Sequence, residues 1–333
     1  MNLAWFGILL AATLSGSFAI PAKKITGLAW DQVWLVYCVV ALVLIPAGLV
    51  IGFAPGLLFE IFPKNLVPVL LVAASGVGWG FGALLFAMSI PRLGFSLAYA
   101  IVCGSVTLVG SIGPLILGTA KLAPGEGGQL ALGLALLMVA IGVSSWASIL
   151  RDRGVNLEAK AAPTLTSSLA GVAIAIVAGA LSALLNIAFA YGSPMIEEAA
   201  GSGVNPIAAS MAVWFPALLG GFFINATATA WKIQRNEGWQ SYRTARSNDW
   251  LRAASLGVLW LGGIIAYSVT APHLGPAGTV YGWAVNGGVS ILVSAAWGIR
   301  TGEWEHAGRP ARAWALAGVV LFVASFAILA TAQ

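Results

Sequence analysis

Residues 76–94 read GVGWGFGALLFAMSIPRLG, and residues 257–275 read GVLWLGGIIAYSVTAPHLG. Seven of these nineteen positions are identical at a constant offset of 181 residues, and they include Trp79 with Trp260. Each copy lies in an apolar segment and ends in Pro-x-Leu-Gly. Self-similarity at a fixed spacing indicates a duplicated structural unit. Secondary transporters are often built from two such units, with the solute site between them.

The composition requires a lipid environment. Hydrophobic residues make up 59% of the 333 residues and charged residues only 8%, whereas charged residues form about 25% of a soluble domain. A spanning helix needs about 20 mostly apolar residues. Ten stretches meet this length: residues 3–22, 32–53, 67–90, 94–118, 130–149, 168–192, 207–231, 250–272, 276–298 and 312–332. The first lacks a basic segment before it, which favours a true helix over a cleaved signal peptide.

The basic residues are distributed unevenly among the predicted connections. Fourteen of the sixteen Lys and Arg follow odd-numbered spans, and the other connections contain only Lys64 and Lys121. Cytoplasmic connections are enriched in Lys and Arg, so we expect the odd-numbered connections in the cytoplasm and both termini outside. The net charge of +5 then reports topology, and no nucleic-acid partner is predicted.

The predicted fold class is an all-α integral membrane protein of ten transmembrane helices, arranged as two inverted five-helix repeats. A polar stretch divides the chain into residues 1–149, a cytoplasmic linker at 150–167, and residues 168–333. Because each half has an odd number of spans, the second copy enters the membrane from the opposite side. The third and eighth spans then correspond, and their centres are expected to meet near the middle of the bilayer.

The absence of charged residues at the centres of the spans argues against several functions. Membrane enzymes need nucleophiles, carboxylates or metal ligands at depth, and the two histidines, His273 and His306, lie in connections. No Gly-x4-Gly-Lys-Ser/Thr motif for ATP binding occurs. Cys38 and Cys103 both fall within apolar spans, where small buried residues are ordinary. We therefore predict no enzyme activity, no metal site and no cofactor.

Neutral hydrogen-bonding and aromatic side chains remain at depth, which suits an uncharged polyol. A sugar can lie with its C–H face on an indole ring while its hydroxyls pair with amides, whereas an ion would need a buried opposite charge. Helix packing is the alternative role for each of these side chains. The predicted substrate-binding residues are Trp79, Trp260, Asn186, Asn286 and Trp283, followed by Trp214, Tyr99 and Asn225. Residues 286–288, Asn-Gly-Gly, also mark a place where the ninth span could loosen.

Three groups of residues carry a resemblance to a known family. They are Ile20-Pro21-Ala22-Lys23-Lys24 with Trp30-Asp31, then residues 194–200 with 203–206, and Glu303-Trp304 with residues 307–310. Together they resemble the L-rhamnose–proton symporter family of the drug/metabolite transporter superfamily. The resemblance implies two inverted repeats and proton-driven import of L-rhamnose or a related deoxy sugar. It also implies a multi-pass protein of the bacterial inner membrane, as a monomer or weak homodimer.

Coupling to protons needs a titratable group that solvent reaches from both sides. The acidic residues nearest to this role lie at helix ends, and they are Asp31, Glu197 and Glu198. Sodium held by neutral oxygens is an alternative coupling ion. Export or exchange of another small neutral solute is the alternative function.

Overall fold

The computed structural model describes residues 3–155 and 165–331, and every regular element in these ranges is helical. Ten helical stretches there are long and apolar enough to cross a membrane, which confirms the predicted number. In chain order they are α1 (Leu3–Ser17) with η1 (Ile20–Lys24), α2 (Trp30–Val39) continued by η2 (Val40–Leu44) and α3 (Ile45–Phe53), α5 (Leu66–Leu93), α6 (Phe95–Ile116), α7 (Glu126–Val155), α8 (Leu165–Tyr191), α11 (Met211–Arg235), α13 (Ser247–Thr270) with η5 (Ala271–Leu274), α14 (Gly278–Arg300) and α15 (Arg309–Thr331).

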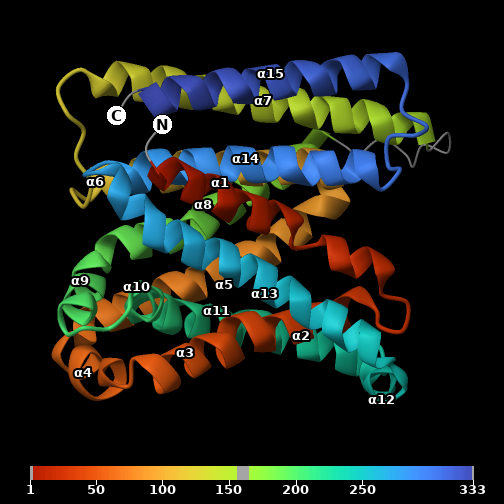
Figure 1. The fold of residues 1–333 in the computed structure, drawn as a ribbon. Helices are drawn as coiled ribbons and strands as arrows, with labels where there is room; N and C mark the ends of the chain where they lie inside the picture. Colours follow the sequence, from red (N-terminus) through yellow and green to blue (C-terminus); the bar gives the residue numbers. More distant parts are fainter. Residues whose placement is uncertain (1–2, 156–164, 332–333) are drawn as a thin grey trace.

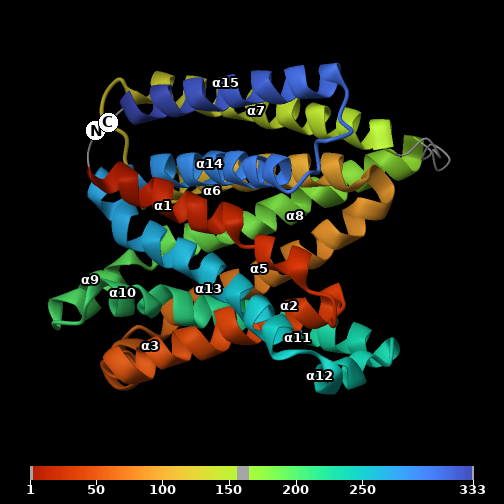
Figure 2. The same ribbon diagram turned by 45° about the vertical axis from the view of Figure 1, so that its right-hand side comes forward.

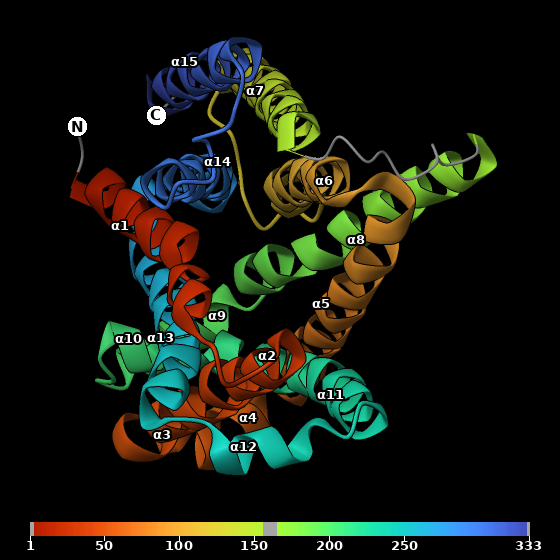
Figure 3. The ribbon, with the colours of Figure 1, turned by 90° about the vertical axis from the view of Figure 1, so that its right-hand side faces the viewer.

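The helices form layers of roughly aligned rods. Helices α7 and α15 lie side by side as an outer pair next to α6 and α14 (Figures 1 and 2). Viewed along the helices, α1, α14, α6, α8, α5 and α2 surround the middle of the molecule, and α7 and α15 lie outside this ring (Figure 3). The start of α1 and the end of α15 lie at the same end of the molecule (Figure 1), as an even number of spans requires.

Two glycines of the duplicated stretch have closely matched surroundings. A Cβ atom on Gly82 of α5 would lie 2.8 Å from the Ala178 carbonyl oxygen and 3.0 Å from the Ser182 nitrogen of α8. A Cβ atom on Gly263 of α13 would lie 2.9 Å from the Ala11 carbonyl oxygen and 3.1 Å from the Ser15 nitrogen of α1. Only glycine allows these helix backbones to approach so closely. Helix α5 therefore packs on α8 in the way that α13 packs on α1.

The repeated turn also has a repeated conformation. Gly94, which ends the first Pro-x-Leu-Gly segment, has a φ of 79°, and Gly275, which ends the second, has a φ of 81°. Backbone with positive φ is accessible to glycine at little cost, so both copies require this residue at the same place.

The structure differs from the sequence-based expectation in several details. Additional short helices occupy the predicted connections: η3 (Leu57–Ile61), α4 (Phe62–Lys64), α9 (Ser193–Gly201), α10 (Pro206–Ala209), η4 (Gly238–Gln240) and α12 (Ser241–Thr244). The second span contains a π-helical turn at η2 that the pattern did not predict.

The expected loosening of the ninth span at residues 286–288 is wrong for this conformation. Helix α14 runs without interruption from Gly278 to Arg300. The two adjacent glycines instead lie against neighbouring helices, since a Cβ on Gly288 would lie 2.8 Å from the Leu137 side chain of α7. Of the predicted linker at 150–167, residues 156–164 lie outside the described residues.

Candidate functional site

The two tryptophans of the duplicated stretch are in direct contact. The Trp79 and Trp260 rings lie 5.6 Å apart with an angle of 16° between their planes, so they stack. Trp260 also meets Tyr37 of α2 edge-on at 5.7 Å, and Trp34 stacks on Tyr37 at 4.6 Å. Both Trp79 and Trp260 are half-buried. This aromatic cluster joins α5, α13 and α2 at the place where the duplicated helices meet.

In this conformation no sugar fits between the two stacked indoles. Stacked rings lie about 4.5–7 Å apart, so a sugar ring inserted between them would require roughly twice the observed spacing. The pair therefore offers one continuous aromatic surface in this state and not two opposed walls. The prediction that Trp79 and Trp260 bind the solute therefore requires contact with this shared surface or a different conformation.

Asn186 of α8 is fully buried and fully hydrogen-bonded. Its amide donates to the carbonyl oxygens of Gly110, at 2.8 Å, and Thr279, at 3.1 Å, and its oxygen accepts from the Tyr267 hydroxyl at 2.6 Å. The Gly110 carbonyl cannot receive the usual helical bond from residue 114, because Pro114 has no N–H. Asn186 thus joins four helices and satisfies a carbonyl that a proline leaves free.

Trp214 and Asn225, both on α11, also have their partners within the protein. Trp214 is fully buried, stacks on Phe189 at 5.5 Å and donates its indole N–H to the Ser268 hydroxyl. The Asn225 amide donates to the Gly221 carbonyl oxygen of its own helix at 3.0 Å. The Trp214 indole N–H is therefore occupied within the protein in this conformation.

Trp283 and Asn286 of α14 differ in whether their hydrogen-bonding groups have partners within the protein. The Trp283 indole donates to the Val106 carbonyl oxygen of α6 at 3.2 Å and meets the Tyr267 ring edge-on. Asn286 is 8% exposed, and its side-chain oxygen has no hydrogen-bond partner among the described residues. A buried acceptor without a partner costs about 1–3 kcal/mol. Asn286 is thus a predicted site residue with a buried acceptor that has no partner among the described residues.

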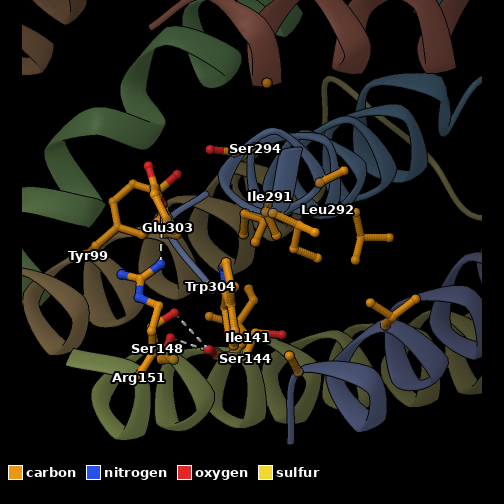
Figure 4. Close-up of a pocket in the computed structure, with 18 of the residues that line it drawn as sticks. Tyr99, Ile141, Ser144, Ser148, Arg151, Ile291, Leu292, Ser294, Glu303 and Trp304 are labelled. Carbon is orange, nitrogen blue, oxygen red and sulfur yellow. Dashed lines mark hydrogen bonds and ion pairs between the residues drawn. The ribbon is translucent and has the colours of Figure 1, made fainter. Parts of the chain in front are cut away.

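A cavity of about 560 Å³ lies between α14, α6 and α1 on one side and α7 and α15 on the other (Figure 4). This volume is within the range of small-molecule sites. Its deep part is lined by aliphatic residues and by serines of α7, and its outer end by Lys23, Arg151 and Glu303. Tyr99 is the one predicted site residue that lines it. The cavity reaches the face that carries most of the Lys and Arg, here termed the Lys/Arg-rich face.

The three predicted coupling residues lie at helix ends, as the sequence indicates. The Asp31 carboxylate lies 3.6 Å from the Lys232 ammonium. Glu198 accepts a hydrogen bond from the Asn65 amide at 2.9 Å, and Glu197 is exposed. The structure does not bring Asp31 together with the two glutamates, because they follow spans that end on opposite faces.

Two further acidic residues, Asp249 and Glu303, also have charged partners, and they are not among the predicted coupling residues. Asp249, in the first turn of α13, is 2% exposed. It accepts from the Gly27 N–H at 3.0 Å and lies 3.5 Å from the Arg252 guanidinium. Glu303 pairs with Lys23 and Arg151. Glu303 belongs to the Glu303-Trp304 motif of the family resemblance, and this motif is the sequence signal that points to it. Asp249 follows a polar loop, so its sequence context is that of a solvated helix end.

These features define a class of protein. Ten spans, and aromatic and amide side chains at depth with no charged side chain at the centre of any described span, are typical of a transporter of small uncharged solutes. Within the described residues no group of three or more His, Cys, Asp or Glu side chains is arranged to hold a metal ion.

The chain belongs to the L-rhamnose-proton symport protein (RhaT) family, whose model matches residues 1–332. This is a family of transporters and not of enzymes. The chain is 24% identical over 329 residues to an L-rhamnose-proton symporter of Mannheimia succiniciproducens, covering 95% of this chain and 94% of the relative. It is also 24% identical over 335 residues to proteins of the same name from Citrobacter koseri and Escherichia coli, covering 98% of this chain and 96% of each relative.

Proposed function

We propose that this protein imports L-rhamnose or a related neutral deoxy sugar by proton symport, through alternating access. The stacked pair of Trp79 and Trp260 carries this proposal, because it places a half-buried aromatic surface where two related helices meet. The family membership and the names of the relatives point to the same solute. Export or exchange of another small neutral solute, or sodium-coupled uptake, is the alternative.

We further propose that the ten spans are two inverted five-helix repeats. The matched surroundings of Gly82 and Gly263 support this arrangement, since each glycine faces an alanine carbonyl and the serine four residues later in the first helix of the opposite half. The matched φ angles of Gly94 and Gly275 support it as well. Alternating access then consists of one half rocking against the other around the tryptophan pair.

In the proposed solute site, a pyranose lies against the tryptophan pair and not between its rings. Trp283 contributes a further aromatic face, and the unpartnered oxygen of Asn286 accepts a hydrogen bond from a sugar hydroxyl. Asn186, Trp214 and Asn225 keep their hydrogen bonds to the protein and hold the helices that carry the site. This division follows from which side chains have unused bonding capacity.

Orientation and coupling complete the proposal. The Lys/Arg-rich face is placed in the cytoplasm of a bacterial inner-membrane protein, with both termini outside, as a monomer or weak homodimer. Asp31, Glu197 and Glu198 are proposed as proton-carrying groups. Each neutral variant, Asp31→Asn, Glu197→Gln or Glu198→Gln, is expected to exchange sugar normally and to lose proton-driven accumulation if it removes the coupling group.

Uptake of labelled L-rhamnose into proteoliposomes tests the function. Saturable uptake that rises with an inward proton gradient and falls with L-fucose or L-lyxose as competitors is expected. Trp79→Ala should weaken L-rhamnose binding by about ten-fold, because one aromatic contact contributes about 0.5–1.5 kcal/mol beyond its buried area. Trp314→Ala, which removes an exposed tryptophan of α15, is the matched control and should bind normally.

Three results would contradict these proposals. No saturable uptake of any of the three sugars means that the solute belongs to another class. Uptake that needs sodium and ignores the proton gradient means that the coupling ion is wrong. Normal sugar binding by both Trp79→Ala and Asn286→Ala places the solute away from the tryptophan pair.

A further inference from the structure

The outer end of the 560 Å³ cavity brings together three charged side chains from η1, from the last turns of α7 and from the connection between α14 and α15. Glu303, in the connection between α14 and α15, accepts a hydrogen bond from the Lys23 ammonium, and its second oxygen lies 3.3 Å from the Arg151 guanidinium (Figure 4). Lys23 follows α1 and also donates to the Thr301 hydroxyl at 2.6 Å. We term Lys23, Arg151 and Glu303 the charged cluster.

Neighbouring residues fix the charged cluster in place. The Arg151 guanidinium lies 5.2 Å from the centre of the Trp304 ring, which is 8% exposed and packs against Ala147 of α7. Arg312 of α15 donates to the Trp304 carbonyl oxygen at 3.0 Å. The Glu303 and Arg151 side chains themselves stay 43% and 20% exposed. Both therefore remain reachable by a solute that enters the cavity.

The mixture of charges selects a chemical class of ligand. An anion in the cavity would be repelled by Glu303, and a cation by Lys23 and Arg151. A neutral polyol can bind groups of both charges, because its hydroxyls donate to a carboxylate and accept from a guanidinium. Such charge-assisted hydrogen bonds are stronger than those between neutral groups. The apolar lining behind the cluster, with Ile141, Leu292 and Phe322, accommodates the C–H face or methyl group of a deoxy sugar.

The cavity is separate from the tryptophan pair. Neither Trp79 nor Trp260 lines it, nor do Asn286 and Trp283. It lies between the outer pair α7 and α15 and the helices that carry the proposed solute site, and it extends to the Lys/Arg-rich face.

We infer that this cavity is a second sugar subsite, used on the Lys/Arg-rich side, in which Glu303 and Arg151 bind the solute hydroxyls. This inference rests on the proposed function and adds a site to it. Lys23 donates a hydrogen bond to the Glu303 carboxylate in this structure, and an arriving sugar replaces Lys23 as its partner. Glu303 is therefore a specificity residue for the solute on one side of the membrane only.

The test measures the KM for labelled L-rhamnose separately on each face, in proteoliposomes with a known protein orientation. Glu303→Gln is expected to raise the KM on the Lys/Arg-rich face about ten-fold or more, since a hydrogen bond to a charged group contributes about 1.5–3 kcal/mol. The KM on the opposite face should change less than two-fold. Glu305→Gln, an exposed acidic neighbour in the same connection, should leave both values unchanged.

Lys23→Met distinguishes a sugar subsite from an ion-pair latch, meaning an ion pair that only stabilises one conformation of the protein. It breaks the same ion pair but keeps the carboxylate, so the KM on the Lys/Arg-rich face should not rise. Lys24→Met is its control, because the contact made by Lys24 is a backbone bond from Arg252. Melting temperatures close to wild type for all four variants would exclude misfolding as the cause.

Each failure has a distinct meaning. Equal KM increases in Lys23→Met and Glu303→Gln would show a latch and overturn the subsite. Unchanged KM values in Glu303→Gln would also overturn it while leaving the proposed transport intact. A wild-type protein that moves no sugar would overturn both proposals.

Discussion

Replacing Asn186 by alanine distinguishes a structural residue from a solute ligand. Its side chain makes three hydrogen bonds, to the Gly110 and Thr279 carbonyl oxygens and from the Tyr267 hydroxyl. Hydrogen bonds between membrane helices contribute about 0.6 kcal/mol each on average. The loss of all three is therefore expected to lower the free energy of unfolding by about 2 kcal/mol. The effect should fall on stability, because the network has no unused group for a sugar.

The free energy of unfolding of purified protein in bicelles, measured by steric trapping or SDS titration, checks this value. Asn225→Ala is the matched control: it removes a buried amide whose hydrogen bond to Gly221 stays within α11, so it should cost less than about 1 kcal/mol. L-rhamnose binding is measured on the same samples. Unchanged stability together with lost sugar binding in Asn186→Ala would refute the assignment of Asn186 to helix packing.

Two further predictions concern topology and the close helix contacts. In a variant without Cys38 and Cys103, a cysteine placed at Ser202 should react with an impermeant thiol reagent added outside intact cells. A cysteine placed at Thr244 should not react. The opposite result would show that the Lys/Arg-rich face lies outside the cell. Gly82→Val and Gly263→Val should each destabilise the protein by about 1–3 kcal/mol through overpacking, because a Cβ atom at either position lies within 3 Å of a backbone carbonyl oxygen. A large difference in stability between the two variants would argue against equivalent repeats.

The number and order of the spans could be predicted because each depends on a local property. About 20 apolar residues suffice to define a spanning helix, and the Pro-x-Leu-Gly turns mark ends that the structure places at Gly94 and Gly275. The contact between Trp79 and Trp260 could also be anticipated, since a duplicated helix brings equivalent residues to the same depth. The repeated sequence stretch thus predicts a contact between residues that are 181 positions apart.

Other features depend on packing between helices, which periodicity does not encode. The π-helical turn at η2 lies in a run of Val, Ala and Leu that an ordinary helix would accommodate equally well. The cavity lies between the outer pair α7 and α15 and the helices α14, α6 and α1, and the spacing of these helices has no local signature. The sequence also did not show that Asn186 would be satisfied by a carbonyl that Pro114 leaves free. All three features depend on how helices that are distant in the sequence pack together.

The matched glycine contacts have a consequence for how the two halves diverged. Ser15 and Ser182, which face Gly263 and Gly82, are 167 residues apart, whereas the glycines themselves are 181 residues apart. If the halves arose by duplication, the second half holds fourteen more residues between its first and third spans, and α9 and α10 lie in that interval. Under the proposed alternating access, we expect opening of one face to displace these extra helical turns and opening of the other to break the ion pairs of Glu303. The outward and inward states of such a carrier would differ in free energy even without a gradient.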